Sequence, residues 1–186
     1  MNFNKHSNLV GLHAFLSASD YHWLNDDPDK LRNRYLNYKA RELGTRYHNI
    51  AKELIELKIK QPKTKTTFNM YVNDAIGFNM TPEQPLIYSE NCYGTADAIC
   101  FNENKSRLRI HDLKTGKTPA SMNQLLIYAS LFCLEYDFKP GEIETILRIY
   151  QNDEVKEMIA TASDLTPVMN KIITADKIIS KLKMEA

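Results

Sequence analysis

The stretch from Gly94 to Gly116 constrains the fold of this chain most strongly. It contains two strand-like runs, Thr95–Phe101 and Arg107–Lys114, separated by five polar residues that are typical of a turn. This pattern predicts a β-hairpin. If the turn is centred between residues 104 and 105, paired residues have numbers that sum to 209, so Asp97 lies opposite Asp112.

One face of this predicted hairpin combines charged and apolar side chains. Lys114 shares the face with Asp97 and Asp112, because side chains alternate along a strand. The other residues of the face are apolar: Ile99, Phe101, Leu108 and Ile110. Directly opposed like charges destabilise a strand pair, and burying an unpaired charge is costly. A divalent cation between the two carboxylates would offset both costs. The alternative is that Asp112 and Lys114 form an exposed pair at a sheet edge and that Asp97 is a turn residue.

Composition places the chain among globular proteins. Its 186 residues suffice for one domain with a sizeable core, and a hydrophobic fraction of 43% with 25% charged residues indicates neither disorder nor a fibrous class. The longest apolar runs are too short to cross a bilayer, and the N-terminal residues lack a signal-peptide pattern. We therefore expect a cytoplasmic protein that does not bind membranes.

The cysteines limit the covalent and metal cross-links that the chain can form, and the charge distribution indicates the kind of partner. Cys92, Cys100 and Cys133 are odd in number and form no CxxC pair, which disfavours a disulfide framework and a structural zinc site. Residues 1–66 carry 12 Lys and Arg against 7 Asp and Glu, a net charge of +5, whereas the remaining 120 residues carry 12 against 16, a net charge of −4. The basic part suits an anionic partner, although basic runs are more commonly solvated faces.

The remaining patterns place helices on both sides of the hairpin. They predict helices over residues 15–24, 30–38, 38–59, 66–78 and 121–136, strands over 86–93, 144–150 and 154–161, and a final helix from Ser163. We expect a single α+β domain over residues 1–186, with about five strands in one mixed sheet flanked by helices. Its parts are a helical N-terminal part over about 15–80, a hairpin region over 86–116, the helix 121–136, and a C-terminal hairpin and helix over 144–186.

The predicted helix over residues 38–59 has two neighbouring stripes. Leu43, Tyr47, Ile50, Leu54 and Leu57 recur at helical spacing and predict the stripe that faces the core. Beside it runs a stripe of mostly small residues: Gly44, His48, Ala51 and Ile55. His48 therefore lies next to a face that another group can approach closely, although an isolated helical histidine is more often structural than a ligand.

Three further candidates lie outside the hairpin face. Gln124 and Tyr128 interrupt an otherwise apolar helix at i and i+4, so their polar ends meet on one side. Glu90, on the predicted strand before the hairpin, is either a further acidic site residue or an edge carboxylate with another partner.

Four short motifs resemble the PD-(D/E)XK nuclease superfamily, and most closely its RecB-like and phage-type exonuclease branch. They are G-T-A-D at 94–97, D-L-K-T-G at 112–116, Q-x-x-x-Y at 124–128 and G-T-x-x-H at 44–48; an unspecific S-A-S at 17–19 is also common in that branch. The resemblance spans roughly residues 15–160 and implies a restriction-endonuclease-like core.

The resemblance also implies roles for individual residues. Asp97, Asp112, His48 and the backbone carbonyl of Leu113 would bind Mg²⁺ or Mn²⁺, and Lys114 would orient or activate the attacking water. Gln124, Tyr128, Thr115 and Lys117 would support the site or contact the substrate. These roles suit phosphodiester hydrolysis, which requires a deprotonated water and compensation of growing negative charge.

The implied activity is that of a metal-dependent deoxyribonuclease, an exonuclease of recombination or repair, and a phage origin is compatible with it. A structure-specific endonuclease and a non-catalytic DNA- or protein-binding module on the same fold are the alternatives. The resemblance leaves open the polarity, the strandedness, the choice of DNA or RNA, a recombination partner protein and a homo-oligomeric state. The cysteines lack the spacing of an iron–sulfur site, and T-G-K-T at 115–118 lacks the first glycine of a P-loop, so we expect neither that cluster nor a bound nucleotide.

Overall fold

The computed structural model describes residues 4–185, which form two compact units. One unit ends at Leu43 and the other begins at Gly44, inside the long helix α1 (Pro28–Glu56). No helix in the described part of the chain is long and apolar enough to cross a membrane. The second unit contains every strand of the described residues and is the part that concerns function.

The N-terminal unit differs from the predicted pattern of two short helices. The helix expected over residues 15–24 is wrong, since only a 3₁₀ helix at Tyr21–Asn25 forms there, after another at Ser7–Leu9. The two helices expected over 30–38 and 38–59 are one continuous helix. It begins at Pro28, and the side chain of Asp27 caps it by accepting a hydrogen bond of 2.8 Å from the backbone N–H of Lys30.

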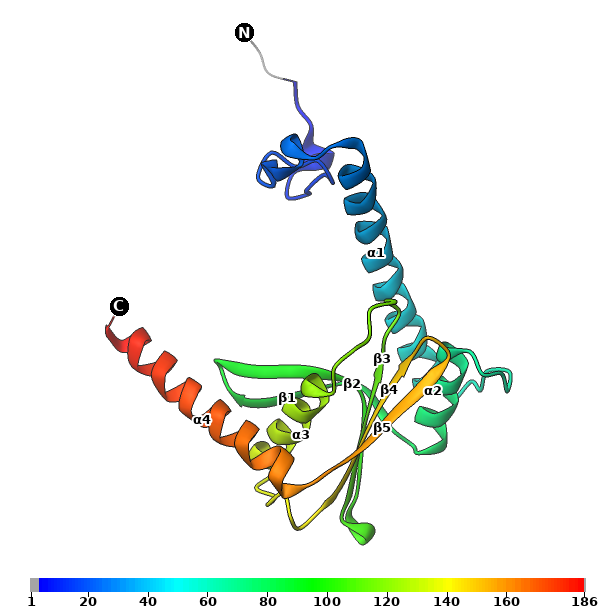
Figure 1. The fold of residues 1–186 in the computed structure, drawn as a ribbon, viewed down its shortest axis with the longest axis vertical. Coiled ribbons are helices and arrows are strands. Elements are labelled where there is room, and N and C mark those ends of the chain that lie inside the picture. The colour runs from blue at the N-terminus through cyan, green and yellow to red at the C-terminus, as the bar shows by residue number, and fades with distance from the viewer. Residues whose placement is uncertain (1–3, 186) are drawn as a thin grey trace. The chain divides into compact units, whose positions relative to one another are not determined.

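The second unit is built around a mixed five-stranded sheet, which confirms the predicted α+β fold with flanking helices (Figure 1). The strands are β1 (Thr81–Ser89), β2 (Cys92–Asn102), β3 (Arg107–Leu113), β4 (Glu144–Gln151) and β5 (Glu154–Ala160), and they lie in sequence order across the sheet. Only β3 and β4 are parallel, and the helix α3 (Asn123–Glu135) connects them.

The predicted register of the hairpin formed by β2 and β3 is confirmed. Ala98 pairs with His111 and Phe101 with Leu108, so the paired numbers sum to 209. The connection is a 3₁₀ turn at Glu103–Lys105, stabilised by the side chain of Asn102, which accepts a hydrogen bond of 3.1 Å from the backbone of Lys105.

The strand predicted over residues 86–93 is wrong in its boundaries. The structure has a turn at residues 90 and 91, between β1 and β2, and β1 begins five residues earlier, at Thr81. Two prolines in β1 made this segment resemble a loop. They are tolerated because β1 is an edge strand, where a missing backbone N–H leaves no central ladder incomplete.

Helices cover both faces of the sheet. The helices α3 and α4 (Ala162–Glu185) pack on one face, around Leu108, Ile110 and Leu147. The helix α2 (Thr67–Gly77) and the C-terminal half of α1 pack on the other face, against Ala98 and Leu113. Helices therefore cover both faces of the central strands, and Figure 1 shows α3 and α2 on opposite sides of the sheet.

The predicted core stripe of α1 is wrong except for Leu54, which packs against the core. Tyr47 and Ile50 are exposed, as is Leu57 just after the helix ends, whereas Ala51 and Ile55 of the neighbouring stripe are buried against α2 and the sheet. Small side chains allow the helix backbone to approach the sheet closely. The stripe that contains His48 is thus the stripe that faces the sheet.

Candidate active site

The two predicted carboxylates meet where the ladder between β2 and β3 ends. Asp97 and Asp112 occupy the positions directly after the pair Ala98 and His111, and the backbone N–H of Leu113 donates a hydrogen bond of 2.8 Å to Oδ2 of Asp97. The side chain of Asp97 is 12% exposed and that of Asp112 is 1% exposed. The alternative of an exposed edge pair with a turn aspartate is therefore wrong.

Burial of these carboxylates disfavours their charged forms. Burial and, to a smaller extent, the neighbouring Asp112 together raise the pKa of Asp97 to about 6, against the opposing effect of His48. Burial also raises the pKa of Asp112, although Lys114 opposes the shift. Burial raises the pKa of the Tyr71 hydroxyl, and the negative charge of Asp97 adds to this effect. A cation bound near the carboxylates would relieve this accumulated negative potential.

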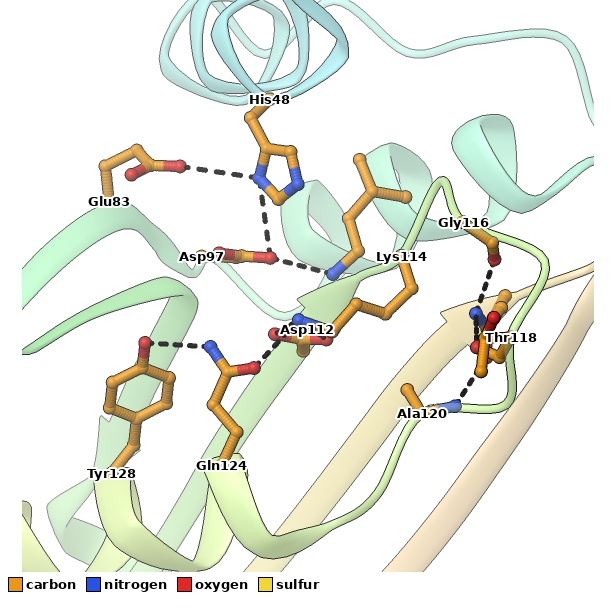
Figure 2. Close-up of polar contacts among 12 residues, drawn as sticks. His48, Glu83, Asp97, Asp112, Lys114, Gly116, Thr118, Ala120, Gln124 and Tyr128 are labelled. Atoms are coloured by element: carbon orange, nitrogen blue, oxygen red, sulfur yellow. Dashed lines mark hydrogen bonds and ion pairs between the residues drawn. The ribbon is translucent and has the colours of Figure 1, made fainter. Parts of the chain in front are cut away.

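Two further side chains complete a set of metal-ligand donors around Asp97. Nδ1 of His48 lies 3.5 Å from Oδ2 of Asp97 and 3.9 Å from Oε1 of Glu83 (Figure 2). One ligand atom from each of these three residues lies within 4.8 Å of the others. Carboxylate oxygens with one imidazole suit a hard divalent cation such as Mg²⁺ or Mn²⁺. The donor set therefore fits the ion that the sequence predicted.

Glu83 is the site residue that the sequence prediction missed. It lies in β1 between Pro82 and Gln84, which pair with Ala98 and Ala96, so the register of this ladder places it opposite Asp97. Its backbone has a positive φ of 50°, a conformation uncommon outside glycine. The signal that could have identified Glu83 is the second hairpin register, once β1 is extended back through its prolines.

Asp112 is close to this donor set but has a different partner. The ammonium group of Lys114 donates a hydrogen bond of 3.0 Å to Oδ1 of Asp112 and lies 3.0 Å from Oδ2, where the contact lacks hydrogen-bond geometry. Oδ2 is buried and has no hydrogen bond among the described residues, so the nearby Lys114 ammonium compensates its charge without satisfying it as a hydrogen-bond acceptor. The carbonyl of Leu113 as a ligand stays a prediction.

A polar chain leads from Lys114 to the helix α3. The ammonium of Lys114 donates to Oε1 of Gln124 over 2.8 Å, and the Gln124 amide donates to the hydroxyl of Tyr128 over 3.0 Å (Figure 2). A Cβ atom at Gly94 would lie 2.9 Å from the Tyr128 ring, so only glycine fits there without displacement. The motif residues Gly94, Lys114, Gln124 and Tyr128 thus form one contact system.

The remaining candidates lie at different distances from this centre. Thr115 packs against α1, where a Cβ atom at Gly44 would lie 2.9 Å from its hydroxyl oxygen. Lys117 is exposed on the loop after β3. Glu90 lies in the turn between β1 and β2, where its carboxylate pairs with Lys183 of α4 over 3.1 Å. The structure therefore does not bring Glu90 to the carboxylate pair.

Comparison with known proteins adds no assignment to this geometry. No protein-family model matches the chain, and no curated protein matches it. The chemistry of the site must therefore be argued from its own residues.

Proposed function

We propose that this protein is a metal-dependent nuclease that hydrolyses phosphodiester bonds in DNA, related to the RecB-like and phage-type branch of the PD-(D/E)XK superfamily. The observation that carries the proposal is the buried pair Asp97 and Asp112, with His48 and Glu83 on one side and the Lys114 ammonium on the other. Four motifs separated in sequence, which resemble that branch, converge at this point.

The carboxylate pair supports metal dependence. Two like charges with raised pKa values destabilise the folded chain when nothing compensates them. The Lys114 ammonium compensates the negative charge of Asp112. Asp97, Glu83 and the imidazole of His48 form a set of metal-ligand donors on the other side. A divalent cation bound by these residues would polarise a phosphate oxygen and lower the pKa of a water molecule.

The role of Lys114 follows from its geometry. An ammonium group has three N–H donors, and two of them are directed at Asp112 and Gln124. The side chain is 30% exposed, so the third donor can reach a substrate phosphate or the attacking water. A positive group held in place before the reaction stabilises the charge that builds on the scissile phosphate.

The test is a cleavage assay with Mg²⁺ or Mn²⁺ on end-labelled linear duplex, single-stranded DNA, RNA and closed circular DNA. The Lys114→Ala protein is assayed alongside, with Lys183→Ala as a control for the loss of one exposed lysine near the protein surface. We expect metal-dependent loss of linear DNA in the wild type and the control, and a loss about 10²–10³-fold slower with Lys114→Ala. The labelled ends then give the polarity.

Other outcomes identify the other functions. Cutting of closed circles would identify an endonuclease, and cutting of RNA alone would change the substrate class. Binding of DNA without cleavage of any substrate would overturn the nuclease proposal in favour of a non-catalytic module.

A further inference from the structure

The loop between β3 and α3 lies between Asp112 and Gln124, which both bind the ammonium group of Lys114. It starts at Lys114, directly after β3, and leads to α3, which carries Gln124. The Lys114 ammonium is bound by Asp112 of β3 and by Gln124 of α3. The course of residues 115–122, which form no helix or strand, therefore sets the separation of two elements that must meet at one nitrogen atom.

One side chain from β4 binds the backbone of this loop at three points. The amide nitrogen of Gln151 donates to the carbonyl oxygens of Gly116 and Thr118 over 2.5 Å and 2.8 Å, and its amide oxygen accepts a hydrogen bond of 2.9 Å from the N–H of Ala120. Both amide hydrogens and one lone pair of Gln151 are thus used on one loop. No other natural side chain of this length offers two donors and an acceptor in that arrangement.

The strand that carries Gln151 is itself fixed on both sides. The backbone N–H of Lys114 donates to the carbonyl of Tyr150 over 2.9 Å, which continues the pairing of β3 with β4. The turn after Gln151 is tied to α2 by Asp153, whose carboxylate accepts hydrogen bonds from the backbone and the hydroxyl of Thr67 over 2.8 Å and 3.0 Å. Gln151 therefore holds the loop from a rigid position.

We propose that Gln151 is a positioning residue for Lys114, an inference that rests on the nuclease function proposed above. By fixing residues 116–120, it sets the separation of β3 and α3 at which Asp112 and Gln124 bind the same ammonium. Gln151 touches neither the donor set around Asp97 nor the Lys114 ammonium, so it acts through the loop alone. Small displacements of a catalytic group have large kinetic effects, because the reacting geometry is narrow.

The kinetic test compares Gln151→Ala and Gln151→Glu with Gln61→Ala, a matched control whose side-chain amide donates a hydrogen bond to the nearby carbonyl of Ile59. The glutamate variant keeps the acceptor for Ala120 but loses both donors. We expect both Gln151 variants to lower kcat about ten- to a hundredfold, with a much smaller change in KM and in the Mn²⁺ midpoint. In the Lys114→Ala background, Gln151→Ala should cause no further loss, since the two residues act as a unit.

A second readout does not depend on cleavage. In ¹⁵N-labelled protein, the side-chain amide resonance of Gln124 should shift in Gln151→Ala and stay in place in Gln61→Ala. An unshifted Gln124 resonance, a rise in KM alone, or an additive loss in the double variant would each overturn the proposal. A wild type that cleaves nothing would overturn the nuclease function instead, and the Gln124 resonance would then decide the role of Gln151.

Discussion

The ammonium group of Lys114 lies 3.0 Å from both carboxylate oxygens of Asp112, at the boundary between the core and the solvent. Asp112 is 1% exposed and Lys114 is 30% exposed, so the pair joins a buried carboxylate to an ammonium group that is accessible to solvent. A lysine whose only task was to neutralise Asp112 would not also need Gln124 and the loop that leads to it.

Replacement of Lys114 should therefore separate catalysis from folding. We expect Lys114→Ala to lower kcat for DNA cleavage by about 10²–10³-fold, the usual effect of removing one preorganised charge-stabilising group. Lys114→Arg should not restore activity, because a planar fork replaces a compact ammonium group. The melting temperature should change by a few degrees at most, since Asp112 can take up a proton when its partner is lost. Cleavage at the wild-type rate by Lys114→Ala would contradict the assigned role.

Glu83 and His48 should control metal affinity. We expect Glu83→Gln and His48→Ala to weaken Mn²⁺ binding by roughly ten- to a hundredfold or more, because each removes one donor of a small set. The stabilisation by metal in a thermal melt should fall accordingly, since it follows the ratio of metal concentration to Kd. Isothermal titration with Mn²⁺ measures the affinity directly.

Glu90→Gln provides the control for that titration. Glu90 is also a β1–β2 hairpin carboxylate, but it lies in the turn and pairs with Lys183, so its removal should leave Mn²⁺ binding unchanged. An unchanged titration for Glu83→Gln would remove Glu83 from the metal site and leave its positive φ without an explanation.

The hairpin that carries Asp97 and Asp112 could be predicted from sequence because its determinants are local. A five-residue polar turn fixes the register, and the side-chain period of two then places both carboxylates and Lys114 on one face. The structure reproduces the register of that hairpin. The burial of the pair also follows, since the same face carries Ile99 and Leu108.

Glu83 and the orientation of α1 could not be predicted in the same way. Two prolines near Glu83 disguise an edge strand, and its pairing with β2 depends on the turn at residues 90 and 91, six residues before Asp97. Periodicity alone identifies two stripes on α1 but not which one faces the sheet. Close packing selected the stripe with Ala51, leaving the larger Ile50 exposed.

The raised pKa of Asp97 makes a prediction about the protein in chelator. Its pKa is about 6 in the folded state, against an ordinary value of 3.8, so the folded chain binds more protons than the unfolded chain between these values. The free energy of unfolding therefore loses a contribution as pH rises from about 4 through 6, by roughly 1 to 3 kcal/mol. Urea unfolding with EDTA at several pH values measures this slope.

Asp97→Asn is the reference for that measurement, because its neutral amide does not titrate. As pH rises through 6, the free energy of unfolding of the wild type should fall relative to that of Asp97→Asn. Added Mn²⁺ should reduce the shift, since the metal favours the charged carboxylate. A difference that does not vary with pH would mean that Asp97 keeps an ordinary pKa and carries no buried excess charge.

Gly94 makes the last prediction, which concerns the packing beneath the polar chain. A methyl group at this position would lie 2.9 Å from the Tyr128 ring, closer than such atoms approach, so Gly94→Ala must displace the ring. We expect a loss of about 1–3 kcal/mol in unfolding free energy, as for other overpacked sites. We also expect kcat to fall, because displacement of Tyr128 would move Gln124 and Lys114, which are linked to it by hydrogen bonds. Gly141→Ala is the control, since nothing lies within 4 Å of its added Cβ. If Gly94→Ala unfolds like the wild type but loses activity, the contact with Tyr128 serves alignment of the chain to Lys114 rather than stability.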